Sequence, residues 1–466
     1  MLGKVFSQGS ARARNSKFET RNSNQIRNSK GRDRSFEFRT FEFDSSFEFR
    51  ISNFHLPLAA FLALALLLLL PFGCSEDNSV APIAANSPQL RVLIVQGASV
   101  INVQADSPRV SLDSQPVALS FPSGLSVPVS LTAQGWHIGR LMLRSGTLDL
   151  QPTAGGIAVD EITYRGSIRL VPLAGGRINV INNVAVEDYL AGVVTKEMYP
   201  DWPIEALKAQ AVASRTYALY ETHTTGMGRP WDVYGDQRSQ MYGGMNAETA
   251  SGRQAVASTQ GIVLTYGPGD GTIFRSYFSS CCGGVTQAAS DAFPGEPYIP
   301  PLAEQSHGTL CSGCKYFNWG PITISKQELT RRIHVWAQRT GEQIGRTIAE
   351  QNMADVLTIE IQSFNRFGRP NRVLVIDARG TQFSWPAEQV RAVVNTDSGK
   401  GPTLPSSFCK ISADPGSSQV TFYDGHGFGH GVGMCQWTAN AEAGAGQDFE
   451  QILADGYPQA KLERAY

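Results

Sequence analysis

The stretch "VVTKEMYPDWPIEALKAQAVASRTYALY", Val193–Tyr220, decides how the rest of the chain is interpreted. It begins apolar, is interrupted by two prolines, and continues as an alanine-rich run. Pro203 lies near the first position of a predicted helix, where its missing N–H removes no hydrogen bond. Two charged residues stand out in this pattern. Glu197 lies at the break, and Arg215 lies on the face that the helix should bury.

Arg215 shares one helical stripe with apolar residues, because spacings of three and four place side chains on one face. The members of the stripe are Leu207, Ala211, Arg215 and Ala218. An unpaired arginine on a buried face would be very costly in free energy. Arg215 must therefore meet an acid, a carbonyl or a ligand, and the pattern alone favours a structural ion pair.

Glu197 follows two valines and precedes Met198-Tyr199-Pro200. A carboxyl among apolar groups has a raised pKa and stays protonated at higher pH, so it is suited to act as a general acid on a glycosidic oxygen. The alternative, an exposed glutamate at a helix end, is the one that the local pattern favours. Glu187 and Glu205 are interpreted as first-turn acids that interact with a helix dipole.

A second candidate segment is "DGHGFGHGVGMCQW", Asp424–Trp437, in which glycines alternate with His426 and His430. Glycines at this density allow sharp turns or close approach of the backbone to a ligand. They argue against a helix that would place both histidines on one metal. Cys435 with His430 is a possible thiol–imidazole pair, although a small buried thiol is the simpler interpretation.

Cysteines form the third candidate group. Cys311-x-x-Cys314 is a knuckle able to hold zinc, with Cys281, Cys282 and His307 as candidates for the remaining ligands. The spacing between the two halves is not that of a standard zinc finger. A disulfide is the alternative, especially in an exported protein.

The ends and composition of the chain limit its class. The chain has 466 residues, with 40 Lys+Arg against 41 Asp+Glu, which gives no reason to expect nucleic acid as a partner. Residues 1–50 repeat Arg-Asn-Ser and Phe-Glu-Phe triplets and are interpreted as a low-complexity extension or a misassigned start. Residues 51–74, with the apolar run "LPLAAFLALALLLLLPFGC", predict a signal peptide, a lipoprotein-type anchor at Cys74, or a plain membrane anchor. All three place the later residues outside the cytoplasm, after a linker over 75–89.

The remaining chain predicts an α+β fold with a mixed, β-rich core and several helices, preceded by a small β domain. Short β-branched runs bounded by Gly, Pro, Asn and Asp predict a β-rich segment over 90–160. A second domain over 161–466 begins with strands and then adds helices. Helical spacing of Leu329, Ile333 and Trp336 predicts one of these helices. "GTIFRSYFSSCCGG" and the segment from "VLTIEIQSFN" to "NRVLVIDARG" are strand-like.

Three long segments together resemble the stage II sporulation protein D family, which includes amidase enhancers. They are "VEDYLAGVVTKEMYPDWPIEALKAQAVASRTYA", "FRSYFSSCCGGVTQAA" and "GFGHGVGMCQWTANAEAGAG", in the order expected of that family. The resemblance covers about residues 160 to 466. It implies a lytic transglycosylase that cleaves peptidoglycan glycan strands, including strands denuded of stem peptides, to 1,6-anhydro-muramyl ends.

The resemblance also implies roles for individual residues. Glu197 would be the catalytic acid/base, supported by Arg215 and His430. Arg215 would orient that carboxylate or bind the lactyl carboxylate of the sugar. Tyr277 and Gln436, within the second and third segments, are the predicted substrate-binding residues.

Departures from the family pattern affect both the turn after Glu197 and the metal site. Tyr199 is inserted into the usual Glu-Met-Pro, and Cys435 and Trp437 replace a serine and a tyrosine. Some relatives bind zinc near the second segment through cysteine and histidine, but Val285 stands where such a histidine is usual. The expected zinc is therefore structural and held by cysteines; the predicted ligands are Cys282, Cys311 and Cys314, with Cys281 or His307 as the fourth.

Three functional hypotheses follow from these features. The first is the transglycosylase; the second is a non-enzymatic envelope protein that binds glycan or activates a cell-wall amidase; the third is a cysteine hydrolase using Cys435 and His430. The expected partners are glycan strands, an amidase in the second case, and the membrane through the N-terminal anchor. No nucleic acid is expected.

Overall fold

The structure, a computed structural model, describes residues 87–466 except 120, 122–123, 270 and 400. All the described residues belong to one compact unit. The predicted extension, signal or anchor segment and most of the linker lie outside the described residues. Within the described part, no helix has the length and apolar character needed to cross a membrane.

The N-terminal region forms two sheets. One has the strand order β13 (Val233–Tyr234), β1 (Gln89–Ala98), β12 (Arg177–Ala185), β11 (Ser167–Leu173), β8 (Leu148–Gln151), β3 (Arg109–Leu112) and β4 (Gln115–Val117). The other has the order β10 (Ile162–Tyr164), β9 (Ile157–Val159), β2 (Val100–Gln104), β5 (Val127–Thr132), β6 (Gly135–Ile138) and β7 (Leu141–Leu143). Alternate residues point into a common core, as Ile101 and Val103 of β2 do.

The sheets continue across the expected boundary at residues 160 and 161. Strand β10 pairs with β9, β11 with β8, and β12 with β1, so strands from both sides of the boundary alternate in the same sheets. Buried residues from both sides also belong to one hydrophobic cluster. The β-rich segment is therefore continuous with the layer of helices that follows it.

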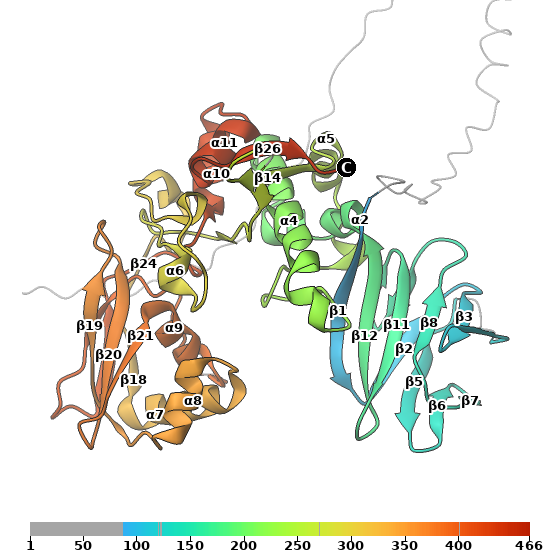
Figure 1. Ribbon diagram of the computed structural model, residues 1–466, viewed down its shortest axis with the longest axis horizontal. Coiled ribbons are helices and arrows are strands. Elements are labelled where there is room, and N and C mark those ends of the chain that lie inside the picture. Colours follow the sequence, from blue (N-terminus) through green and yellow to red (C-terminus); the bar gives the residue numbers. More distant parts are fainter. Residues whose placement is uncertain (1–86, 120, 122–123, 270, 400) are drawn as a thin grey trace, which may run out of the picture. The chain divides into compact units, whose positions relative to one another are not determined.

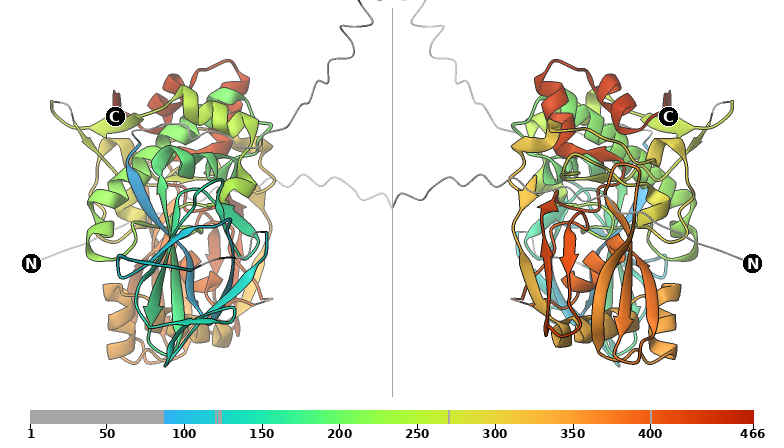
Figure 2. Two further views of the ribbon diagram at one scale, coloured as in Figure 1. Left: turned by 90° about the vertical axis from the view of Figure 1, so that its right-hand side faces the viewer. Right: turned by 90° about the vertical axis from the view of Figure 1, so that its left-hand side faces the viewer.

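The helical layer begins directly after β12. It contains α2 (Val186–Ala191), α3 (Val194–Glu197), α4 (Ile204–His223), α5 (Ala250–Ser258), α10 (Gln436–Gly444) and α11 (Phe449–Gly456). The predicted helix around α2 is broken at Gly192, where a Cβ atom would lie 2.7 Å from the Gly244 carbonyl oxygen. Helix α4 is lined by buried alanines, which permits close packing of α10 and α11 against it (Figure 1). Both views of Figure 2 show these red C-terminal helices beside the green ones.

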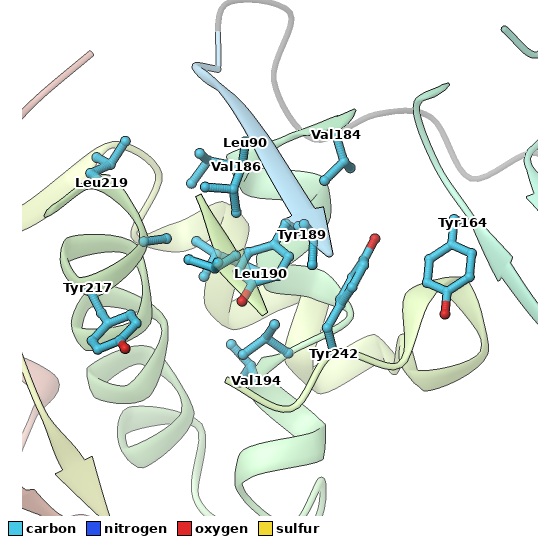
Figure 3. Packing of buried hydrophobic residues seen from close by; sticks show 14 of the residues in the cluster. Leu90, Tyr164, Val184, Val186, Tyr189, Leu190, Val194, Tyr217, Leu219 and Tyr242 are labelled. Carbon is cyan, nitrogen blue, oxygen red and sulfur yellow. The ribbon is translucent and has the colours of Figure 1, made fainter. Parts of the chain in front are cut away.

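A small sheet closes this layer, with the order β15 (Thr272–Ile273), β14 (Ile262–Tyr266) and β26 (Lys461–Arg464). Figure 3 shows how the layer is packed: Tyr189 and Leu190 of α2 lie beside Leu90 of β1, Val194 of α3 and Tyr242. The Tyr189 and Tyr242 rings are 4.8 Å apart. This packing holds α3 and therefore its last residue, Glu197.

A separate unit is inserted between β17 (Asn318–Trp319) and β24 (Gly425–His426), which pair with each other. It contains β18 (Ile322–Ser325), α7 (Lys326–Arg339), α8 (Gln343–Glu350), β19 (Val356–Phe364), β20 (Pro370–Asp377), β21 (Gln382–Pro386), α9 (Ala387–Asn395), β22 (Lys410–Ser412) and β23 (Gln419–Tyr423). We call it the inserted unit (orange in Figure 1). Leu329, Ile333 and Trp336 are buried in its own hydrophobic core, as their spacing predicted.

The segment predicted as a strand around Phe274–Gly284 is mostly irregular. Only β16 (Phe278–Ser279) forms there after β15, and it pairs in parallel with β25 (Met434–Cys435). Gly283 and Gly284 have positive φ angles of 68° and 93°, which end the extended conformation. The remaining short elements are α6 (Ala289–Ala292) and the 3₁₀ turns Thr225–Gly228, Gly244–Ala247, Pro300–Leu302 and Leu310–Gly313. The α+β class predicted from the sequence is confirmed.

Candidate functional site

A cavity of about 790 Å³ lies between the helical layer, the glycine-rich loop and the inserted unit. It contains three of the predicted site residues, Glu197, His430 and Gln436. The other lining residues are Gln237, Ser239, Met241, Phe278, Ser279, Ser280, Tyr316, Ile322, Arg391, Ala392, Asn395, Thr403, Leu404, Pro405, Phe428 and Gly429. The mixture of aromatic and hydrogen-bonding side chains suits a polar ligand with apolar faces, such as a sugar.

Glu197 ends α3 and is half-buried at the cavity wall. Burial raises the pKa of the Glu197 carboxyl above its ordinary value, while hydrogen bonds from the Met241 backbone N–H and the Gln436 amide act in the opposite direction. The Met241 N–H lies 2.6 Å from Oε1. The carboxyl is thus held in one orientation and keeps its proton to a higher pH than a solvated glutamic acid.

A buried chain of amides supports the Glu197 carboxyl from behind. Gln436 Nε2 donates to Gln210 Oε1 at 3.2 Å, and Gln210 Nε2 donates to Ser214 Oγ at 2.9 Å. Gln210 and Ser214 belong to α4 and are fully buried. The alanine-rich helix therefore positions Gln436, a role of Gln210 and Ser214 that the sequence analysis missed. Buried polar residues within an alanine-rich run were the available signal.

His430 lines the cavity with a neutral imidazole. Its Nδ1 accepts a hydrogen bond from the Val432 N–H at 3.0 Å, and burial lowers the pKa of the ring to about 4. The ring packs edge-on against Tyr277 and Phe293, with centroids 5.8 and 5.4 Å away. At neutral pH, His430 therefore contributes an uncharged ring to the cavity wall.

Tyr277, predicted to bind substrate, lies behind His430 and outside the residues that line the cavity. Its hydroxyl donates to Glu296 Oε1 at 3.0 Å and accepts from Arg275 Nη1 at 3.2 Å. Its ring stacks on Phe293 with centroids 4.6 Å apart. In this arrangement Tyr277 supports the His430 ring.

Arg369, which the sequence analysis did not single out, connects the two glycine-rich segments. It enters from the β19–β20 hairpin of the inserted unit and is 1% exposed. Its guanidinium donates to the carbonyl oxygens of Val285 at 2.8 Å, His430 at 3.0 Å and Cys282 at 3.3 Å. A side chain at Gly431 would collide with this guanidinium, which explains the glycine there. No local pattern marks a hairpin arginine for this role.

Arg215 lies outside the residues that line the cavity, although the resemblance implied a role in catalysis. Its Nε and Nη2 pair with Glu187 Oε1 at 2.9 Å and Oε2 at 2.7 Å, and both side chains are fully buried. Nη1 donates to the Ile262 carbonyl at 3.0 Å. Glu187 also accepts from the Tyr466 hydroxyl at 2.6 Å. The Arg215 guanidinium therefore forms an internal ion pair and hydrogen bonds that connect α4 with α2 and β14. Glu187 is the partner in this ion pair, a role beyond the helix-dipole interaction expected from the sequence.

Tyr199, the residue inserted after Met198, is 58% exposed beside the cavity-lining Glu197. Its ring lies 5.3 Å from Trp202, and Trp202 lies 5.0 Å from Trp437. The Trp437 backbone N–H donates to the carbonyl of Ser280, a cavity-lining residue. The turn after Glu197 is therefore covered by an aromatic cluster of Tyr199, Trp202 and Trp437.

Five cysteines form a buried cluster that includes the predicted metal ligands; they are Cys281, Cys282, Cys311, Cys314 and Cys435. The Sγ atoms of Cys282, Cys311 and Cys435 all lie within 4.8 Å of one another. Cys282 Sγ and Cys311 Sγ are 3.6 Å apart, and all five thiols are free. This separation is close to the roughly 3.8 Å expected for two sulfurs of a tetrahedral zinc with Zn–S of about 2.3 Å. The donor set therefore fits zinc.

The three mutually close sulfurs are those of Cys282, Cys311 and Cys435. Cys435, for which the sequence favoured the role of a small buried thiol, thus takes the place of the predicted Cys314. Cys281 and Cys314 interact with each other at the edge of the same cluster. His307, the other predicted fourth ligand, has a buried Nε2 without a hydrogen-bond partner among the described residues. Burial lowers the pKa of His307, while the neighbouring Cys311 opposes this shift. Cys281, Cys314 and His307 are thus the candidates to complete a four-ligand site.

The thiol–imidazole pair proposed for Cys435 and His430 is not supported by their hydrogen bonds. The Cys435 thiol donates to the Ser280 carbonyl at 3.7 Å and accepts from the Cys282 N–H at 3.2 Å. Burial raises the pKa of the Cys435 thiol to about 12, opposite to the lowered pKa of a nucleophilic cysteine. His430 Nδ1 is occupied by Val432.

Comparison with known proteins shows which proteins the chain is similar to. Residues 174–266 match the profile of a family described as "Stage II sporulation protein". An uncharacterized protein of Brachyspira hyodysenteriae is 31% identical over 304 residues, which span 65% of this chain and 72% of the relative. The amidase enhancer of Bacillus subtilis is 28% identical over 308 residues, 59% of this chain but 40% of the enhancer. Stage II sporulation protein D of Bacillus amyloliquefaciens is 26% identical over 325 residues, 66% of this chain and 82% of the relative.

Proposed function

The chain belongs to the stage II sporulation protein D family, and from this premise we propose that it is a peptidoglycan lytic transglycosylase. The observation that carries the proposal is the composition of the cavity. Among the described residues that line it, Glu197 is the only carboxylic acid. Most glycoside hydrolases need two carboxyl groups, one as acid and one as base or nucleophile. A lytic transglycosylase needs one, because the substrate's own hydroxyl is the nucleophile.

The proposed reaction uses Glu197 twice. Its carboxyl donates a proton to the glycosidic oxygen as the bond from that oxygen to the anomeric carbon of the muramic sugar breaks. The 6-hydroxyl of the same sugar then bonds to that carbon, and its proton passes to the Glu197 carboxylate. The proton lost in the first step is recovered in the second, and the product carries a 1,6-anhydro ring. No activated water is required.

The surrounding groups suit this cycle. The raised pKa of Glu197 favours the protonated form that begins it, and the hydrogen bonds from Met241 and Gln436 stabilise the carboxylate formed midway. His430 is neutral and lies on the wall, where it packs or hydrogen-bonds without adding charge. Arg369 holds the backbone at His430 and at the cysteine loop, and so keeps the wall in place.

The second candidate is a non-catalytic glycan-binding protein that activates a cell-wall amidase. The similarity to the Bacillus subtilis amidase enhancer favours it, and the two hypotheses share the same cavity. Incubation of the protein with purified peptidoglycan, with and without stem peptides, followed by mass spectrometry separates them. Anhydro-muramyl ends support the transglycosylase. Glycan binding without such ends, together with faster cleavage by an added cell-wall amidase, supports the enhancer.

We place the protein at the cell envelope, exported and attached to the membrane, on the basis of the apolar run that ends at Cys74. Cell fractionation tests this placement, and recovery in the soluble cytoplasmic fraction would contradict it. If Cys74 is lipidated, Cys74→Ser releases the protein from the membrane.

We expect one structural zinc per chain, held by Cys282, Cys311 and Cys435 with a fourth ligand from Cys281, Cys314 or His307. Four protein ligands leave no open position for substrate, so the zinc would stabilise the loops around the cavity. Metal analysis of the purified protein should find zinc near one equivalent, and Cys311→Ser should lose it. Cys409→Ala is the matched control, because Cys409 is a buried thiol of the inserted unit. A zinc-free protein with a Cys282–Cys311 disulfide in peptide mapping would refute this expectation.

The cleavage rate should depend on pH in a way set by Glu197 and His430. Glu197 must begin protonated, so the rate falls as pH rises through its raised pKa. It should also fall below about pH 4, where His430 gains a charge inside the cavity. Gln436→Leu removes a hydrogen bond that favours the carboxylate, and should move the alkaline limb to higher pH.

Thr403 is an exposed residue that the inserted unit contributes to the cavity lining, and Thr403→Val is the control for Gln436→Leu. It should leave the alkaline limb in place. A limb that stays fixed in Gln436→Leu would argue that another group controls the rate at high pH.

A further inference from the structure

Arg391 is a cationic residue on the part of the cavity wall that the inserted unit forms, outside the three segments that resemble the family. It lies on α9 of the inserted unit, which also contributes Ile322, Ala392, Asn395 and the segment 403–405 to the lining. The described lining residues include no other lysine or arginine. His430 stays neutral at physiological pH. One acid and one permanent cation therefore share the cavity, and they come from different parts of the fold.

Glu388 holds the Arg391 guanidinium in place through only part of its hydrogen-bond donors. Its Nε donates to Glu388 Oε1 at 2.6 Å, and Nη2 lies 2.5 Å from the same oxygen. Glu388 is buried, and the arginine side chain is 24% exposed. Among the described residues, no group accepts a hydrogen bond from Nη1. One edge of the guanidinium is thus fixed by the protein, and the other is available to a ligand.

The proposed substrate carries an anion on the sugar that reacts. Each muramic sugar bears a lactyl group on the same ring whose anomeric carbon reacts, so this group must enter the cavity that contains Glu197. In glycan without stem peptides the lactyl group ends in a free carboxylate. With a stem peptide attached, the same carbon is part of a neutral amide. An arginine binds a carboxylate through charge-assisted hydrogen bonds that an amide cannot match.

We propose that Arg391 binds the free lactyl carboxylate and is the specificity-determining residue that makes the site prefer glycan without stem peptides. This inference rests on the proposed function for the identity of the substrate. Hydrogen bonds to charged groups contribute about 1.5–3 kcal/mol. This corresponds to a preference of about 10- to 150-fold for a free over an amidated lactyl group.

The test compares two forms of one substrate. Glycan strands are stripped of peptides, and half of the sample is converted to lactyl methylamides, which removes the charge without adding a peptide. The preference is the ratio of kcat/KM for anhydro-end formation on the two forms. The unmodified protein should prefer the free carboxylate by about 10- to 150-fold.

The variant must not leave Glu388 as a buried charge without its partner. We therefore use Arg391→Gln combined with Glu388→Gln, which neutralises both members of the pair. In this double variant the preference should fall to nearly one, because cleavage of the stripped glycan slows far more than cleavage of the methylamide. Glu388→Gln alone keeps the cation and should keep the preference.

Three outcomes would overturn the role of Arg391. They are an unmodified protein that cleaves both forms equally, a double variant that keeps the preference, and a double variant that loses both substrates in equal proportion. The last result would make the Glu388–Arg391 pair purely structural. Sedimentation with the two insoluble glycan forms distinguishes failure of the proposed reaction. One such result is an unmodified protein that cleaves neither form yet binds the free-carboxylate form more tightly, with the double variant losing this difference in binding. In that case the proposed transglycosylase reaction is wrong, but Arg391 still binds the lactyl carboxylate.

Discussion

Glu197→Gln should abolish the formation of anhydro-muramyl ends while the protein still folds and still binds glycan. Glutamine is nearly isosteric with glutamic acid and can keep the hydrogen bond from the Met241 N–H. It cannot give up and recover a proton. General acid–base catalysis contributes about 10²- to 10⁴-fold to a rate, and here one group would supply both halves of it. Mass spectrometry of the released fragments measures the loss, and sedimentation with insoluble glycan measures binding.

Glu205→Gln is the matched control for this substitution. Glu205 lies eight positions further along the chain, where it pairs with Lys208 at 2.7 Å and accepts from the Phe449 N–H at 3.0 Å. These half-buried contacts at the start of α4 involve none of the described residues that line the cavity, so cleavage should be nearly unchanged. Full cleavage by Glu197→Gln would show that the catalytic assignment is wrong. An unmodified protein that binds glycan but never cleaves it would favour the amidase-enhancer hypothesis.

Arg215→Met should destabilise the protein by about 3–5 kcal/mol, because it leaves the Glu187 carboxylate buried without its cation. Met fills most of the space of the arginine side chain, so the loss reports mainly on charge. The double variant Arg215→Met with Glu187→Gln removes both charges and should recover most of the stability. The remaining amide oxygen can still accept from the Gly261 N–H and the Tyr466 hydroxyl. Urea denaturation followed by tryptophan fluorescence measures the differences.

The same variants test whether Arg215 acts in the reaction. If its role is only structural, glycan cleavage per folded molecule should be nearly the same in the unmodified protein and in the double variant. A double variant that is stable but cleaves glycan much more slowly would show that Arg215 takes part in the reaction, as the resemblance implied. The full burial of both side chains makes the first outcome the expected one.

Local periodicity in the sequence was sufficient for many elements. The alanine stripe predicted α4, the spacing of Leu329, Ile333 and Trp336 predicted α7, and β-branched runs predicted β1, β19 and β20. These patterns predict structure because the residues on one face of a helix or strand must be buried together. The same patterns could not reveal the inserted unit. Its limits are set by pairing between β17 and β24, where Asn318 and His426 are 108 positions apart in the chain.

The family resemblance singled out Glu197, His430 and Gln436, and the structure brings these three residues to one cavity. The resemblance did not identify Met241, Gln210, Arg369 or Arg391. Met241, Arg369 and Arg391 reach the site from distant segments, and no local spacing records such an approach. Gln210 lies on α4, close to Glu197 in the chain, where only its burial within an alanine-rich run marks it. The cysteine cluster likewise could not be predicted from local spacing. Cys435 comes close to Cys282 and Cys311 through the pairing of β16 with β25.

The sequence by itself determined the α+β class, most of the long helices and strands, and the acidic residue at the break before α4. Only the tertiary structure decided what surrounds each charge. Glu197 is left at a cavity wall with a raised pKa, whereas Arg215 on the neighbouring helix is neutralised by Glu187. The physical reason is that helix and strand periods depend on neighbours in the chain. The pKa and pairing of a buried charge depend instead on partners that folding brings from elsewhere.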